Sequence, residues 1–407
     1  MIPVEDARER ILARIAVGAT ERVELARALR SVLAEEVVAA LDIPPWPNSS
    51  MDGYALRADD TRHATPTAPA RLALAGRVAA GGTADRSLRA GEAFRIFTGA
   101  PLPEGADSVI PQEEVTTEDA MVLLSRPTRV GEFVRPRGED MRAGETVLHC
   151  GHALGPAEIG VLATLGRTQV SVVKRPHVGI LSTGDEIVDL GGRVGPGQIP
   201  NSNTYSLMAQ VAEAGAVPVN LGVARDRLED IVGRLEWGLG SDVLISSAGV
   251  SVGEHDFVKA ALERLGAEQH LWLVDMRPGK PIAFATIPTG SKAPLPVFAL
   301  PGNPVSAMVT FELFVRPAIL RMAGHTRLDR PLVTARALAP IPNPGSRRGY
   351  LRVTLSPEAA GWGARLTGDQ GSGILRSMVA ADGLAVVAGN TTIEPGEPVK
   401  VMLLRAT

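Results

Sequence analysis

The chain has 407 residues, 45% of them apolar and 21% charged, a composition typical of a globular protein with roughly two to four domains. Its formal net charge of −3 argues against a general affinity for nucleic acid or acidic membrane surfaces. Cys150 is the only cysteine, which excludes an internal disulfide and predicts a reducing, cytoplasmic location. The best candidate for a membrane span, residues 307–315, contains Glu312 and is far shorter than the roughly 20 residues that a span needs.

The N-terminal part of the chain combines helical and β-type patterns. Helical periodicity predicts helices over residues 5–15 and 21–36, and the prolines at 44–47 end the second pattern. Short apolar runs separated by Gly and Pro follow and predict a small β-rich domain, after which a helical pattern returns at 156–162. We therefore expect a β-rich domain inserted into a helical linking domain. The expected boundaries are residues 1–43 and 140–172 for the linking domain and 44–139 for the inserted domain.

Four short apolar runs alternate with helical stretches in the next part of the chain, residues 173–327. Strands that are buried on both faces and separated by helices are typical of a doubly wound parallel sheet. The remaining residues, 328–407, return to short strands and predict a small β-barrel, with a sandwich as the alternative. The apolar runs are residues 178–181, 217–223, 243–245 and 297–300, and the helical stretches lie near 203–214, 226–237, 256–265 and 304–322.

Ligands of an open parallel sheet bind beyond the carboxyl ends of its strands, and four loops of this chain occupy such positions. These loops are rich in Ser, Thr and Gly, which let backbone N–H groups approach an anion closely. We therefore expect an anion site at this edge of the sheet. The loops are residues 182–186, 224–226, 246–256 and 301–306, and the small residues expected to bind substrate are Ser182, Thr183, Gly184, Ser251 and Gly253.

Acidic residues in three of these loops need an explanation, because carboxylates repel an anion. Asp256 precedes a helical stretch and could simply cap it, an alternative that stays open. Asp185 and Glu186 are different, since two glycines follow at 191–192 and the next helical stretch begins only near Asn203. A Mg²⁺ ion between acids and phosphate would offset the repulsion, and it prefers oxygen ligands of both kinds. Glu186 and Asp256 are the predicted magnesium ligands.

Two further stretches concentrate polar residues. In residues 277–281, Arg-Pro-Gly-Lys-Pro, two cations are held on a chain stiffened by prolines, which suits a phosphate or another oxyanion as well as a surface turn. The Asp-Gly pair at 52–53 lies between extended segments, and taken alone it is most simply a turn.

Together these stretches resemble the molybdopterin molybdenumtransferase family, called MoeA in bacteria and related to the E domains of gephyrin and plant Cnx proteins. The resemblance covers nearly the whole chain, and several motifs in the family's order are far more specific than any single one. They are P-N-S-S-M-D-G-Y-A (47–55), R-I-F-T-G-A-P-L-P-E-G-A-D (95–107), L-S-T-G-D-E (181–186), A-G-V-S-V-G-E-H-D (248–256), R-P-G-K-P (277–281) and L-P-G-N-P-V-S (300–306).

The resemblance implies an elongated subunit of four parts and a homodimer. The active site would lie between the α/β domain of one subunit, which binds molybdopterin, and the inserted β domain of the other. The implied reaction is the Mg²⁺-dependent insertion of molybdate into adenylylated molybdopterin, with release of AMP. Other proteins of molybdenum cofactor biosynthesis are possible partners under this resemblance, whereas nucleic acid and membranes are not expected.

The resemblance also implies roles for individual residues. In the C-terminal part, Ser346 and Tyr350 replace the family's usual Gly and Phe, so Arg348 competes with Arg347 for one of these roles. The implied catalytic residues are Asp52, Thr98, Glu186, Asp226 and Asp256. The implied substrate-binding residues are Arg277, Lys280, Pro301, Asn303, Pro304, Ser306, Arg347, Arg352 and Ser372.

Three other functions stay open at this point. A molybdopterin adenylyltransferase uses a similar α/β domain but would not need the inserted and C-terminal parts. A tungstate-inserting paralogue would differ only in its oxyanion. A non-catalytic scaffold of the same fold predicts lost acids, whereas the expected acids are present. The His149-Cys150-Gly151-His152 stretch resembles a zinc clip, but no second pair of ligands accompanies it, which disfavours a zinc site.

Overall fold

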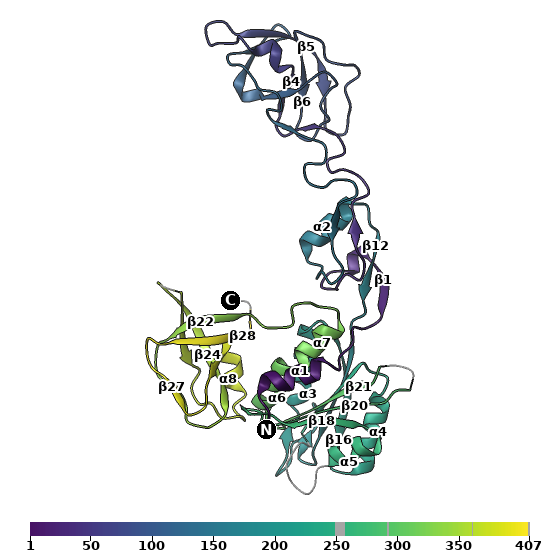
Figure 1. Cartoon of the computed structure of the whole chain (residues 1–407), viewed down its shortest axis with the longest axis vertical. Coiled ribbons are helices and arrows are strands. Elements are labelled where there is room, and N and C mark those ends of the chain that lie inside the picture. Colours follow the sequence, from purple (N-terminus) through teal and green to yellow (C-terminus); the bar gives the residue numbers. More distant parts are fainter. Residues whose placement is uncertain (249–256, 291–292, 360, 406–407) are drawn as a thin grey trace. The chain divides into compact units, whose positions relative to one another are not determined.

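The computed structural model describes residues 1–248, 257–290, 293–359 and 361–405 (Figure 1). The chain divides into two compact units. One unit comprises residues Met1–Glu35, Cys150–Ile159 and Thr168–Thr407, and the other comprises Glu36–His149 and Gly160–Arg167. Within the described residues, no helix is both long enough and apolar enough to cross a membrane.

A six-stranded sheet forms the centre of the first unit. Its first four strands are parallel, which confirms the predicted doubly wound sheet, and the last two strands are added through antiparallel pairings. In spatial order the strands are β16 (Val217–Ala224), β13 (His177–Thr183), β17 (Val243–Ser247), β21 (Leu295–Leu300), β20 (Pro281–Ile287) and β18 (Glu268–Leu273).

Helices cover both faces of this sheet (Figure 1). Alternate side chains of a strand point to opposite faces, so Val178 and Ile180 belong to one core and Leu181 to the other. A short π-helix, Phe311–Val315, joins α6 to α7. The first face carries α1 (Val4–Leu12), α3 (Asn203–Glu213), α6 (Pro304–Thr310) and α7 (Arg316–Met322), and the second carries α4 (Leu228–Gly238) and α5 (Phe257–Arg264).

The C-terminal residues form a closed five-stranded barrel, which confirms the predicted barrel over the sandwich. Closure comes from β24, which pairs with β25 on one side and β26 on the other. Tyr350 and Met402 of the barrel are buried in the same core as α1 and α7, so the barrel packs on the α/β domain. Its strands are β24 (Arg348–Glu358), β25 (Gly361–Leu366), β22 (Leu332–Ala337), β28 (Pro398–Leu403) and β26 (Gly383–Val387).

The predicted helix over residues 21–36 is wrong. Strand β1 (Thr20–Glu24) pairs instead with β12 (Gln169–Val173), and a single 3-10 turn follows. Leu33, which helical spacing placed on an apolar helix face, makes a β-bridge to Val172. The apolar positions are buried by strand pairing with residues far along the chain, which overrides a weak local preference for helix. Among the described residues of the predicted linking domain, the helices are therefore α1, where a helix was predicted, and α2 (Pro156–Thr164), and the rest is short strands and a 3-10 turn.

The second unit contains the predicted β-rich domain, built on another six-stranded sheet. Gly53 begins β4, which pairs with neighbours on both sides, and a Cβ there would lie 1.9 Å from the carbonyl oxygen of Ile110. The Asp-Gly pair is thus explained by close strand packing as well as by the preceding bend. In spatial order the strands are β7 (Ser108–Pro111), β4 (Gly53–Leu56), β6 (Glu92–Ile96), β5 (Ala70–Val78), β9 (Met121–Leu124) and β8 (Val115–Glu118).

Candidate active site

A cavity of about 650 Å³ lies at the carboxyl ends of the parallel strands, and we call it the sheet-edge cleft. It is lined by the loop after β13, by the end of β17 and by the loop before α6, as the strand order predicts. Gly373, next to the predicted Ser372, comes from the C-terminal region. The lining residues from the predicted set are Ser182, Thr183, Glu186, Asn303 and Pro304.

The loop after β13 turns sharply at Gly184, which has a φ of 142°. A Cβ at this position would lie 2.5 Å from a carboxylate oxygen of Glu186, so only glycine leaves room for that side chain to fold back. Asp185 and Glu186 do not begin a helix, as predicted, because the short strand β14 (Ile187–Val188) follows and α3 starts at Asn203. These carboxylates are therefore available for a ligand.

The third described acid, Asp226, lies close to the first two. Its backbone N–H donates to Asp185 Oδ1 over 3.4 Å. Partial burial, and then the negative charges of Asp185 and Glu186, raise the pKa of Asp226. A cation would relieve this repulsion, so the donor set fits Mg²⁺. Within the described residues no three acids or histidines are already gathered as metal ligands, and Ser251, Gly253 and Asp256 lie outside those residues.

A chain of hydrogen bonds supports the wall of the cleft. Ser182 Oγ is 2.7 Å from Thr204 Oγ1 and donates to Asn201 Oδ1 over 3.3 Å. Asn201 in turn donates to Asp189 over 3.3 Å, and Tyr205 donates to the same carboxylate oxygen over 2.9 Å. Asp189 and Asn201 therefore connect the loop after β13 to the start of α3. The sequence motifs did not indicate either residue.

Asn203 is a third residue that the motifs missed. Its side-chain amide donates to Ser247 Oγ over 2.8 Å and to the Gly302 carbonyl over 2.7 Å. It thereby ties the end of β17 to the loop that precedes α6. Its own Oδ1 is buried with no partner among the described residues. Asn201 and Asn203 line the cleft, and Asp189 contacts it through Asn201. Their only signal in the sequence is their place near a predicted strand end or helix start.

The loop before α6 reaches the cleft through Gly302, Asn303 and Pro304, whereas the predicted Pro301 is buried and does not line it. Pro304 is the first helical residue, where a missing N–H costs nothing. The N–H of Val305 donates to the Ser372 carbonyl over 3.1 Å, so the predicted Ser372 lies against the start of this helix. Ser306 is buried, and its carbonyl accepts a hydrogen bond from Thr310 within α6.

The predicted cations come together beside α6. Arg277 is exposed and Lys280 half-buried, and a Cβ at Gly279 between them would lie 2.5 Å from Thr310 Cγ2, so this loop packs directly on the helix. Strand β19 (Met276–Arg277) pairs with the start of β24, which places Arg347 close enough to donate to the Met276 carbonyl over 3.0 Å. Arg348 instead forms an ion pair with Glu5 of α1. Arg347 is therefore the arginine that accompanies Arg277.

Arg352 has no exposed surface. It donates to Ser377 Oγ over 3.0 Å and to the Gly371 carbonyl over 2.9 Å, and burial lowers its pKa to about 10. In this structure the guanidinium supports the segment that carries Ser372, and no carboxylate among the described residues bonds to it.

Asp52 and Thr98, both in the second unit, are brought together across 46 positions of sequence. One carboxylate oxygen of Asp52 accepts hydrogen bonds from the backbone N–H of Thr98 at 2.8 Å and from its hydroxyl at 2.7 Å. These two bonds lower the pKa of Asp52, so the side chain is ionised at neutral pH. Thr98 thus holds the Asp52 carboxylate in one orientation.

Comparisons with known proteins match the chain in three consecutive parts. Family models describe residues 2–166 as the MoeA N-terminal region (domain I and II), 179–321 as a probable molybdopterin binding domain and 334–404 as the MoeA C-terminal region (domain IV). The chain is 37% identical over 400 residues to a molybdopterin molybdenumtransferase of Nostoc sp., covering 95% of this chain and 89% of that protein. The chain belongs to the molybdopterin molybdenumtransferase family.

Other members of the family support this assignment. The molybdopterin molybdenumtransferase of Bacillus subtilis is 34% identical over 414 residues, covering 99% of this chain and 94% of that protein. A crystal structure of the molybdopterin biosynthesis MoeA protein from Pyrococcus horikoshii superposes with a TM-score of 0.85 at 30% identity, covering 99% of this chain and 100% of that one. The predicted family resemblance is confirmed.

The hydrogen bond between Asn201 and Asp189 can be tested by exchanging the two residues. Asn201→Asp places two carboxylates where the structure has a 3.3 Å hydrogen bond, whereas Asp189→Asn combined with Asn201→Asp restores a carboxylate–amide pair. We expect the single variant to speed hydrogen exchange at the Ile199 and Asn201 amides at least about tenfold, because a bond to a charged group contributes about 1.5–3 kcal/mol. The double variant should recover most of the protection, and equal exchange in both would show that the pair does not hold this wall.

The raised pKa of Asp226 predicts a pH-dependent effect on stability. A carboxyl whose pKa is higher in the folded protein destabilises the fold at pH values above that pKa. Asp226→Asn should therefore raise the free energy of unfolding at pH 7 without added metal, by less than about 1 kcal/mol because the group is largely exposed. The gain should fade as the pH falls toward about 3.9, the ordinary value for aspartate. Urea unfolding at both pH values checks this, and a pH-independent gain would contradict it.

Proposed function

We propose that this chain is a transferase that inserts molybdenum into molybdopterin during biosynthesis of the molybdenum cofactor. The observation that carries the proposal is the match along nearly the whole chain to curated proteins named for this activity. The sheet-edge cleft is consistent with it, because it lies in the part that matches the probable molybdopterin binding domain.

The finer proposal is that the substrates are adenylylated molybdopterin and molybdate, and that AMP is released with the help of Mg²⁺. Bound magnesium would neutralise charge on the diphosphate and activate it toward cleavage. Glu186 and Asp226 are the described residues that would hold the ion, with Asp185 beside them. The small residues at 182–184 would let backbone N–H groups approach the phosphate closely.

The cations of the loop that packs on α6 suit the second substrate. Molybdate is a tetrahedral dianion, which needs fixed positive charge and hydrogen-bond donors. Arg277, Lys280 and Arg347 supply cations on a loop held against α6 and a neighbouring strand. We propose that they bind the oxyanion, and that Arg352 acts by holding the segment with Ser372 in place.

A homodimer is part of the proposal. Asp52 and Thr98 belong to the unit that does not contain the sheet-edge cleft, and their role is taken from the family resemblance. The partner's inserted domain would bring this carboxylate to the cleft. A cytoplasmic location and contacts with other cofactor biosynthesis proteins are proposed on the same basis, together with the single cysteine.

The metal role of Glu186 predicts loss of activity without loss of fold. Glu186→Gln keeps the shape of the side chain and removes its charge, so AMP release from adenylylated molybdopterin with Mg²⁺ and molybdate should fall at least about tenfold. Glu236→Gln, on an exposed position of α4, is the matched control and should not change the rate. An unchanged rate in Glu186→Gln would remove the residue from the mechanism.

The same assay of the unaltered chain separates the alternative functions. AMP release with tungstate but not with molybdate would identify tungstate as the substrate, and no release with either oxyanion would favour a non-catalytic scaffold.

The proposed dimeric site predicts complementation between two inactive variants. Asp52→Asn and Glu186→Gln should each be inactive alone. After the subunits are exchanged, a mixed dimer would hold one site with both changes and one with neither. The mixture should then recover about a quarter of the unaltered rate, because half of the dimers are mixed and half of their sites are intact. Failure to recover, with subunit exchange verified by mass spectrometry, would place both residues of a site on one subunit.

A further inference from the structure

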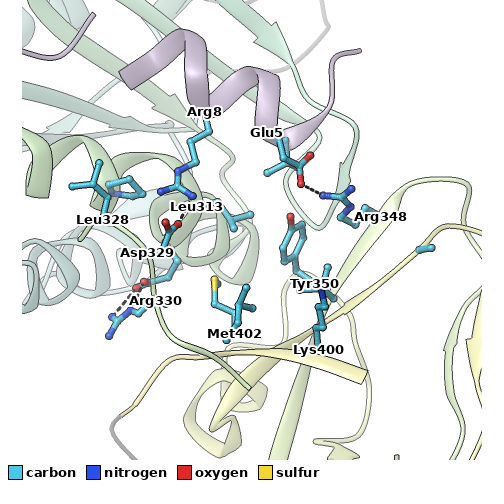
Figure 2. Close-up of a pocket in the computed structure, with 16 residues that line it drawn as sticks. Glu5, Arg8, Leu313, Leu328, Asp329, Arg330, Arg348, Tyr350, Lys400 and Met402 are labelled. Atoms are coloured by element: carbon cyan, nitrogen blue, oxygen red, sulfur yellow. Dashed lines mark hydrogen bonds and ion pairs between the residues drawn. The ribbon is translucent and has the colours of Figure 1, made fainter. Parts of the chain in front are cut away.

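A second cavity, of about 510 Å³, lies between α1, the helical segment around Leu313 and the C-terminal barrel (Figure 2). It shares no lining residue with the sheet-edge cleft. Its size is within the range of roughly 300–1,000 Å³ that small-molecule sites occupy. We call it the barrel cavity.

The walls of the barrel cavity are largely apolar. Leu313 and Leu328 face it from the α/β side, and Met402 and the ring of Tyr350 face it from the barrel (Figure 2). Such a surface favours a ligand with an apolar body, because burying that body removes apolar area from water.

The charged residues around the cavity are almost all paired with one another. Arg8 of α1 forms an ion pair with Asp329, and Glu5 forms one with Arg348 (Figure 2). Arg330 pairs with Glu312 at 2.9 Å. Among the described residues that line the cavity, these pairs use every acid and leave one cation, Lys400, without an acidic partner.

We propose that the barrel cavity binds a small organic acid, whose apolar body fills the space beside Leu313 and Met402 and whose carboxylate pairs with Lys400. The unmatched positive charge disfavours a cationic ligand there and gives an acid an advantage over a neutral molecule of the same shape. An apolar body and a single anionic group are together the chemistry that this lining complements.

Occupancy would affect the contact between the barrel and the rest of its unit. The ligand would touch the π-helix through Leu313 and the barrel through Tyr350 and Met402, so it would stabilise their packing. The strand that carries Tyr350 into this cavity also begins next to Arg347, which contacts the Met276 carbonyl. Tyr350 of this strand therefore lines the barrel cavity, while Arg347, just before the strand, belongs to the proposed oxyanion site.

The proposal is tested with two probes of equal shape, 1-naphthylacetate and its neutral amide, titrated into the full chain and followed by probe fluorescence. The acid should bind saturably and about tenfold more tightly than the amide, the difference expected when one partner of a hydrogen bond gains charge. Lys400→Met keeps the apolar stem of the side chain and removes its charge, so it should abolish the preference. Lys174→Met is the control, because Lys174 is exposed and does not line the cavity, and it should leave the preference for the acid unchanged.

A blocking variant distinguishes the cavity from other surfaces. Ala388 lines the cavity and is exposed, so Ala388→Trp can fill the space without disturbing the core, and it should eliminate binding of both probes. Equal thermal unfolding of the variants and the unaltered chain verifies that each is folded. The proposal is overturned if the unaltered chain binds neither probe saturably at millimolar concentration. It is also overturned if Lys400→Met keeps the preference, or if Ala388→Trp binds as before. The readout is binding, so its failure leaves the proposed transferase activity untouched.

Discussion

The parallel pairing of β13 with β16 and β17 is the constraint on which the site depends. In this register Ser182 lies opposite Ser247, and Thr183 lies opposite Ala224, so the three strands end at the same level. The residues that follow each strand are consequently brought to one edge of the sheet. That arrangement places the acids close together although they repel one another, and partial burial followed by the charges of Asp185 and Glu186 raises the pKa of Asp226. A cation bound between these acids would be attracted by all of their negative charges.

A second constraint is the packing of the barrel on the α/β domain. Tyr350 and Met402 join the core around α1, and the Ser372 carbonyl accepts a hydrogen bond from the first turn of α6. The barrel therefore brings Arg347 to the loop that carries Arg277, and that loop packs on α6.

Much of the fold was predictable because its signals are local. Apolar runs of strand length alternate with helical stretches, and four of the six central strands and their helices follow that pattern. The small and acidic loop residues could be identified because strand ends of a parallel sheet are the places where ligands bind. Asp189, Asn201 and Asn203 could not, because single polar residues carry no periodic signal. Their roles depend on partners up to 99 positions away, as in the bond from Asn203 to Gly302.

The sequence by itself determined the family, the order of its parts and the motifs at the sheet edge, because each is written in consecutive residues. Only the tertiary structure decided which of the adjacent Arg347 and Arg348 lies beside Arg277, since that choice is made by the pairing of β19 with β24. It also decided that Arg352 is buried and that residues 20–24 form a strand. The physical reason is common to all three: side-chain direction and burial are set by neighbours that are distant in the chain, and local preference is too weak to oppose them.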